Sequence, residues 1–211
     1  MTRRANRFNI GRTTQCSPEA IINHSDQKLV TRYSDGDTGD IIETILEMDR
    51  QSHRWVRSDA AAQCLVGNDE EETLCNVWAF VKSNVRYRAD KAGHEKVQSP
   101  GALFASRVGD CKSYSIAEAA LLRALDIPYR YRFASYGPGD FTHVYIVART
   151  SSGWKPLDAV HTAPLEEARY YRKKDIDPQQ TAIGALPTPT NTAMNWKNIG
   201  LLALLIYLVA K

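Results

Sequence analysis

The sequence has little net charge, no closely spaced pair of cysteines and no apolar segment at its N-terminus. A formal net charge of +3 over 211 residues is too small to indicate a nucleic-acid-binding protein, so we expect no specific nucleic-acid partner. The four cysteines form no CxxC pair and are too sparse for the disulfide framework of a small secreted protein, so we expect a reducing interior. Residues 1–16 carry charge without an apolar stretch, and the sequence therefore predicts no secretory signal peptide.

Long apolar runs are also rare, and the one clear example lies at residues 199–210 (IGLLALLIYLVA). As a helix this run spans only about 18 Å, whereas the hydrocarbon core of a bilayer is about 30 Å thick. A crossing would need Met194 to Lys211, with Lys197 and Lys211 reaching the interfaces beside Trp196. We expect a membrane anchor, with the folded domain on the cytoplasmic or virion-interior side because most positive charges precede the run. A helix packed against a partner protein is the alternative.

The chain length suits one compact domain with extensions. We predict a basic N-terminal arm at residues 1–36, a compact domain at 37–171, a linker containing proline and threonine at 172–195, and an apolar tail at 196–211. Basic residues cluster in the arm and at residues 169–174, and both clusters are interpreted as solvated surface.

The first half of the predicted domain has helical periodicity. Apolar residues recur at helical spacing from Ile41 to Met48 and from Leu74 to Val81. Cys64 and Cys75, in the same half, are interpreted as small buried hydrophobic residues. A loop at 89–100 and a short helix at 101–107 follow, and a longer helix rich in alanine and leucine begins at Cys111 and stops before Pro128.

The second half of the predicted domain has the pattern of strands. Strands are predicted at residues 129–135, 142–148 and 154–158, and the turns between them contain glycine, proline and serine. Helices followed by an antiparallel meander indicate an α+β fold.

Cys111 stands where a nucleophilic cysteine would be expected. A thiol reacts as the thiolate, and the first turn of a helix favours negative charge because its backbone N–H groups are unpaired. Asp110 is a good N-cap and Gly109 permits a tight entry, so Cys111 is predicted to be the first helical residue.

A cysteine nucleophile needs a base, and the base needs a group that orients it. Alternation in the strand at 142–148 separates His143 and Tyr145 from Thr142 and Val144. A short turn leads to the next strand, which ends at Asp158 and could bring this carboxylate beside His143. The sequence thus predicts a Cys111, His143, Asp158 triad.

Short blocks between Trp78 and Asp158 also follow the order of a known family. The blocks are Val85-Arg86-Tyr87, Ser99-Pro100, Gly109-Asp110-Cys111, LLRALDIPYR at 121–130, Thr142-His143-Val144-Tyr145, and GWKPLD at 153–158. In these blocks the chain resembles the transglutaminase-like superfamily, whose core is related in architecture to papain-like proteases. The resemblance implies a papain-like α+β fold for the domain at 37–171, with helices packed on an antiparallel sheet and the nucleophile at the start of the central helix. In outline, the basic arm and apolar tail resemble small phage-encoded proteins.

The resemblance implies a hydrolase or acyltransferase that attacks an amide or ester carbonyl through a thioacyl-enzyme. Cys111 would be the nucleophile, His143 the general base and then acid, and Asp158 the orienting group. The backbone N–H of Cys111 would be one oxyanion donor, and Gln98 is a candidate for a second. No cofactor is implied. The expected partner is a peptide or protein substrate, with the stem peptide of peptidoglycan as one candidate.

Two other interpretations remain open on the sequence alone. The chain could be a catalytically silent module of a membrane-associated or virion assembly that keeps this fold. The side chains of Cys111, His143, Asp158 and His161 also have the right chemistry for zinc, but their spacing matches no zinc motif, and His161 is better interpreted as a surface residue.

Overall fold

Helix α6 (Cys111–Ala124) is the central element of the computed structural model, which describes residues 16–25, 27–33, 38–91 and 94–179. Every residue from Lys112 to Leu122 is buried. This agrees with the alanine- and leucine-rich sequence, because a helix that is apolar on most sides is stable only when other elements cover it. The α6 helix packs against strands of the main sheet and against helices on its other sides.

Six helical elements besides α6 are distributed along the first half of the chain. Their bounds are α1 (Pro18–Ile21), α2 (Thr38–Arg50), the 3-10 helix η2 (Ser52–Arg54), α3 (Ser58–Leu65), α4 (Glu70–Asn84) and α5 (Pro100–Ser106) among the described residues. Helix α4 begins where the acidic residues predicted a start, since the Asp69 carboxylate accepts a hydrogen bond from the Glu72 N–H at 2.7 Å. The predicted helices at α2, α4, α5 and α6 are confirmed.

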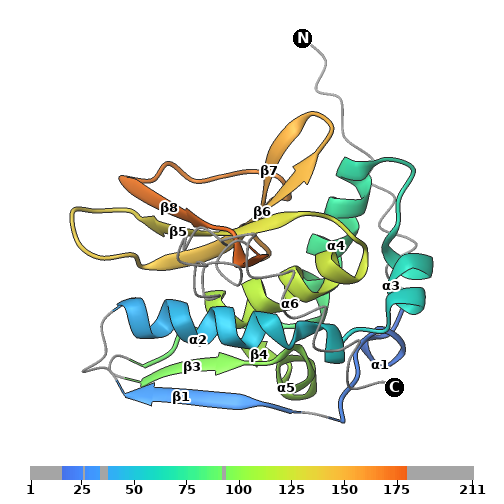
Figure 1. The fold of residues 1–211 in the computed structure, drawn as a ribbon, viewed down its shortest axis with the longest axis horizontal. Coiled ribbons are helices and arrows are strands. Elements are labelled where there is room, and N and C mark those ends of the chain that lie inside the picture. Colours follow the sequence, from blue (N-terminus) through green and yellow to red (C-terminus); the bar gives the residue numbers. More distant parts are fainter. Residues whose placement is uncertain (1–15, 26, 34–37, 92–93, 180–211) are drawn as a thin grey trace, which may run out of the picture. The chain divides into compact units, whose positions relative to one another are not determined.

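The main sheet has four antiparallel strands in the order β7-β6-β5-β8. The strands are β5 (Tyr129–Ser135), β6 (His143–Thr150), β7 (Gly153–Leu157) and β8 (Arg172–Ile176). Two smaller pairs flank the helices: β1 (Leu29–Tyr33) lies antiparallel to β3 (His94–Gln98), and β2 (Arg86–Tyr87) lies parallel to β4 (Val108–Gly109). Helices α2 and α6 lie between the main sheet and the β1–β3 pair (Figure 1).

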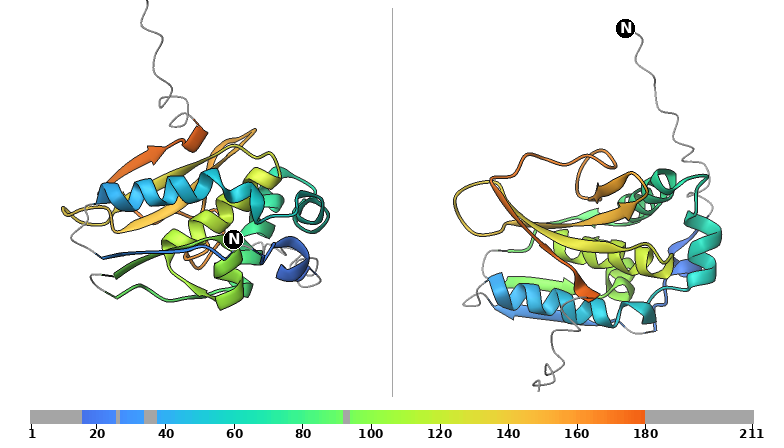
Figure 2. Two further views of the ribbon diagram at one scale, coloured as in Figure 1. Left: turned by 60° about the horizontal axis from the view of Figure 1, so that its bottom comes forward. Right: turned by 45° about the horizontal axis from the view of Figure 1, so that its top comes forward.

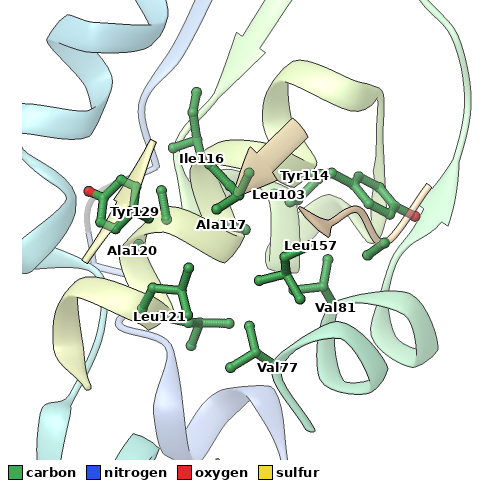
Figure 3. Packing of buried hydrophobic residues seen from close by; sticks show 14 of the residues in the cluster. Val77, Val81, Leu103, Tyr114, Ile116, Ala117, Ala120, Leu121, Tyr129 and Leu157 are labelled. Atoms are coloured by element: carbon green, nitrogen blue, oxygen red, sulfur yellow. The ribbon is translucent and has the colours of Figure 1, made fainter. Parts of the chain in front are cut away.

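The core forms where α4 and α6 meet the inner face of the sheet. Figure 3 shows the side chains of Val77 and Val81 from α4 directed towards those of α6 and Leu157. Leu121, on α6, is fully buried within this cluster. Its replacement by alanine should cost about 2–5 kcal/mol of folding free energy, because the vacated space is only partly refilled.

Five short strands, β1, β2, β3, β4 and β8, lie in segments where the sequence predicted none. Strand β1 and the buried Ile21 and Ile22 fall within the predicted arm at 1–36, β3 within the predicted loop at 89–100, and β8 at the start of the predicted linker. Figure 2 shows β1 and β3 running side by side. Strands β3 (HEKVQ) and β8 (RKKDI) carry many charged residues, and β8 is exposed at four of its five positions, so neither has the alternation that identifies a half-buried strand.

Two of the four cysteines form a disulfide, which corrects the prediction of a reducing interior. Cys16 pairs with Cys64 and joins the segment before α1 to helix α3. Disulfides form and persist in oxidising surroundings, not in a reducing interior. Because Cys64 is bonded to Cys16, its interpretation as a simple buried hydrophobic residue was wrong. Cys75 is a buried free cysteine, as predicted.

Within the described residues, no helix is long and apolar enough to cross a membrane. The predicted anchor at residues 196–211 and most of the predicted linker lie outside the described residues. The anchor therefore stays a prediction.

Candidate active site

Cys111 is the first residue of α6, the position predicted for the nucleophile. The Asp110 carboxylate caps the helix by accepting a hydrogen bond from the Ser113 N–H at 3.3 Å. A Cβ atom at Gly109 would overlap the fully buried side chain of Leu103, so the tight entry to the helix requires glycine. Cys111 is a free, partly exposed thiol in the first turn of the helix.

His143 and Asp158 lie side by side at the adjoining ends of β6 and β7. The His143 Nε2 atom is 2.7 Å from Asp158 Oδ2, and both side chains are largely buried. The antiparallel pairing of Ile146 with Leu157 sets this geometry, because it brings the residue that follows β7 next to the start of β6. The same carboxylate accepts the Val160 N–H through Oδ1 at 2.9 Å, which fixes its orientation.

The surroundings of His143 favour its protonated form. Burial by itself would lower the pKa of His143, but the hydrogen bonds to Asp158 and Cys111, together with their negative charges, outweigh burial and raise that pKa to about 10. The imidazole is thus hydrogen-bonded to both Asp158 and Cys111. The structure therefore brings the three predicted residues together.

Aromatic rings hold and border the imidazole. The Tyr145 ring stacks on His143 with centroids 5.5 Å apart, and its hydroxyl donates to Glu167 at 2.5 Å. Tyr136 lies 6.1 Å from the same imidazole and is 47% exposed. Tyr87 is 44% exposed and pairs with Gly109 across β2 and β4. Neither Tyr87 nor Tyr136 was predicted to belong to the site.

Two polar residues on one face of α6 were also missed, Ser115 and Glu118. The Ser115 hydroxyl contacts the carbonyl oxygens of Cys111, at 2.8 Å, and of Val144, at 2.9 Å. Glu118 accepts the Ala159 N–H at 2.8 Å. Val144 directly follows His143 in the chain, and Ala159 directly follows Asp158. The spacing of positions 111, 115 and 118 puts polar groups on one face of an otherwise apolar helix, a signal that could have found them.

Helix α4 holds the segment around Asp158 from another side. The Trp78 indole donates to the Asp158 carbonyl oxygen at 2.9 Å, and the Lys82 ammonium donates to the carbonyl oxygens of Val160 and His161. Helix α4, helix α6 and strand β6 all form hydrogen bonds with this segment, and these bonds hold the Asp158 carboxylate in position. The His161 ring contacts the backbone of Ala163, which agrees with its interpretation outside the triad.

Gln98 lies next to the entry of α6. Its side-chain amide donates to the Val108 carbonyl oxygen at 3.0 Å, and its oxygen accepts from the Ser106 hydroxyl at 3.1 Å. These bonds brace the backbone just before Gly109. The amide has a second N–H, so the suggested role of Gln98 as an oxyanion donor stays a prediction.

Three carboxylates converge beside the nucleophile, those of Asp90, Glu95 and Asp110, with oxygen atoms within 4.8 Å of one another. The Lys112 ammonium contacts all three. The cation among these carboxylates is thus a side chain of the protein itself, and we assign no metal there.

Residues 58–159 match the family model of the transglutaminase-like superfamily, and all the predicted site residues lie within the matched segment. This segment is a transglutaminase-like domain. The family recognised from the sequence blocks and the predicted α+β fold are confirmed. No curated protein matches the chain.

Several solved structures are similar to parts of this chain. A candidate cysteine protease from Cytophaga hutchinsonii is 20% identical with a TM-score of 0.43, over 69% of this chain and 54% of that one. A candidate protease from Parabacteroides distasonis is 14% identical with a TM-score of 0.41, over 58% and 27%. A protein described as a TGase is 12% identical with a TM-score of 0.36, over 66% and 38%. The chain therefore spans little more than half of the first and less of the others.

Proposed function

We propose that this protein is a cysteine-nucleophile hydrolase or acyltransferase that acts on an amide or peptide bond. The observation that carries the proposal is the position of His143, which is hydrogen-bonded to Asp158 at 2.7 Å and to Cys111 on its other side. A nucleophile, a base and an orienting carboxylate in one line are the parts that acyl transfer needs. The transglutaminase-like family of the segment supports the same chemistry.

The proposed reaction begins with a thiolate at Cys111 and a proton on His143, a division that the raised pKa of the imidazole favours. The sulfur attacks the substrate carbonyl carbon, and the carbonyl oxygen takes up negative charge. We propose that the backbone N–H of Cys111, which belongs to the first turn of the helix, donates to this oxygen. His143 then gives its proton to the departing amine, which leaves a thioacyl-enzyme.

The second half of the proposed reaction releases the acyl group. His143, now neutral, accepts a proton from water or from an amine as that molecule attacks the thioester carbonyl. The bond between the Cys111 sulfur and the carbonyl carbon then breaks, and the thiolate is regenerated. Asp158 stabilises the imidazolium each time His143 is protonated. Water gives hydrolysis, whereas an amine gives transamidation. We propose a peptide or protein as the substrate, and the stem peptides of peptidoglycan are one class to test.

Thiol alkylation under native conditions tests the proposal. In wild type, iodoacetamide should modify Cys111 rapidly below about pH 8.5, the pKa of an ordinary cysteine. Cys75 is an internal control, because burial and the nearby charges of Glu71 and Asp69 raise the pKa of its thiol to about 11. Cys111→Ala should lose the labelling, and Cys75→Ser should keep it.

Acyl-enzyme trapping completes the test. An activated acyl ester should leave one acyl group on Cys111, detectable by mass spectrometry of the intact protein and of its peptides. Equal labelling of wild type and Cys111→Ala would refute the proposal and favour the alternative of a catalytically silent module.

A further inference from the structure

Three carboxylates gather at the start of α6, around the residues that flank Cys111 in the chain. Asp110 precedes Cys111 and is only 4% exposed, while Glu95 comes from β3 and Asp90 from the segment between β2 and β3. A concentration of carboxylates near a thiolate disfavours it, because like charges repel more strongly where water is largely excluded.

Lys112 occupies the centre of this cluster. Its ammonium nitrogen is 2.6 Å from Glu95 Oε2 and 3.4 Å from Asp90 Oδ2, and it also contacts Asp110. The side chain is 8% exposed. A lysine is rarely so buried unless it is paired, and here three carboxylates from three parts of the chain pair with it.

The position of Lys112 next to Cys111 links the cluster to the reactive sulfur. Burial by itself would lower the pKa of Lys112, but the charge and hydrogen bond of Asp110, the charge of Cys111 and the hydrogen bond of Glu95 raise that pKa above its usual value. Tyr87 also interacts with Cys111 and Asp110, and burial raises the pKa of its hydroxyl, so it stays neutral near pH 7. Lys112 therefore remains a cation over the working pH range.

We propose that Lys112 is a positioning residue that acts as an internal counter-ion, offsetting the three carboxylates so that the Cys111 thiolate can form. This inference rests on the proposed function. Lys112 does so in two ways, by contributing positive charge near the sulfur and by tying β3 and the preceding segment to the N-cap of α6. A purely structural role would include only the second.

The test measures the rate of Cys111 alkylation by iodoacetamide against pH in the full chain. Lys112→Met keeps the length of the side chain and removes its charge, and it should move the profile to higher pH by about one unit, so that alkylation near pH 6 is about tenfold slower. Lys112→Arg should leave the profile near that of wild type. Lys155→Met is the matched control, because Lys155 pairs with Glu71 on the surface and has no contact with the cluster.

Neutralising a carboxylate should have the opposite effect. Glu95→Gln is expected to move the profile of the wild type to lower pH, and in the Lys112→Met background to restore part of the lost rate. Urea denaturation and circular dichroism establish that each variant is folded. Should Lys112→Met fail to fold, Glu95→Gln alone decides the matter.

The outcomes separate this inference from the proposed function. Folded Lys112→Met with an unchanged profile, or folded Glu95→Gln with no shift, overturns the role of Lys112 and leaves the nucleophile assignment intact. Wild-type protein that is not alkylated at Cys111 overturns both.

Discussion

The Glu118 carboxylate accepts a hydrogen bond from the backbone N–H of Ala159 at 2.8 Å, and Ala159 directly follows Asp158. Helix α6 thus carries Cys111 at its first residue and, two turns later, binds the segment that contains Asp158. Glu118 is 1% exposed, and burial, assisted by the charge of Asp158, raises its pKa well above the ordinary value.

Glu118→Gln and Glu118→Leu should behave differently. Glutamine keeps an oxygen that can accept the Ala159 N–H, so the rate of acyl-enzyme formation should stay close to that of wild type. Leucine leaves this buried N–H without its partner and releases the segment, so the rate should fall about 10- to 100-fold. Stopped-flow acylation of the two variants measures the difference. Equal rates in both would mean that Glu118 does not position Asp158.

The free energy of unfolding of wild type relative to Glu118→Gln should depend on pH. Because the pKa of Glu118 is raised on folding, the stability linked to its proton is present below about pH 4.5 and is lost as pH rises. Glu118→Gln removes this titration. The free energy of unfolding of the glutamine variant relative to wild type should therefore increase from about pH 4.5 to neutrality. Urea denaturation across this range measures the trend, and a constant difference would contradict it.

His143→Ala should impair acylation more than Asp158→Ala. The first change removes the proton acceptor, a loss of about 10²- to 10⁴-fold, whereas the second removes only the group that orients it. Both rates are measured with one activated ester under saturating conditions. A greater loss in Asp158→Ala would reverse the proposed roles.

His143 should stabilise the fold more strongly at low pH than at high pH. Its pKa is raised from 6.5 to about 10, so the stabilising contribution is fully present below pH 6.5 and is lost as pH rises through 10. The difference in unfolding free energy between wild type and His143→Gln should therefore shrink over this interval, by up to a few kcal/mol. Chemical denaturation at both ends of the interval checks this prediction. A difference that grows with pH would exclude the imidazolium–carboxylate pair.

Breaking the Cys16–Cys64 disulfide should lower stability without changing the chemistry. The bond joins positions 48 residues apart, so Cys16→Ser with Cys64→Ser should cost about 2–4 kcal/mol of unfolding free energy. Alkylation of Cys111 at a temperature where the variant is folded should proceed as in wild type. A parallel loss of Cys111 reactivity would show that α3 influences the site.

The proximity of Cys111, His143 and Asp158 could be predicted because the segments that carry them have local signals. Asp110 marks the helix start at Cys111, and the short turn between β6 and β7 limits how far Asp158 can lie from His143. The four-stranded sheet was predicted except for β8, whose exposed lysines and arginine carry no apolar alternation.

The supporting contacts could not be predicted in the same way. Glu118 meets Ala159 across 41 residues of sequence, and Lys112 meets Glu95 across 17. A glutamate and a lysine in a helix normally indicate a solvated face, and only the packing of α6 against other elements on several sides reverses that expectation. The pairing of Cys16 with Cys64 has the same origin, because two cysteines 48 residues apart carry no signal of contact in one sequence.

The Cys16–Cys64 disulfide and the free thiol of Cys111 require opposite redox conditions when the protein is handled. Reductants that protect the free thiol of Cys111 in storage also reduce the bond between Cys16 and Cys64. Oxidants that would restore this bond convert the partly exposed Cys111 to a sulfenic acid. Loss of activity after reduction and loss after oxidation therefore have different chemical origins. Thiol counting on the native and the denatured protein distinguishes them, and a preparation suited to kinetics has one reactive thiol, one buried thiol and one intact disulfide.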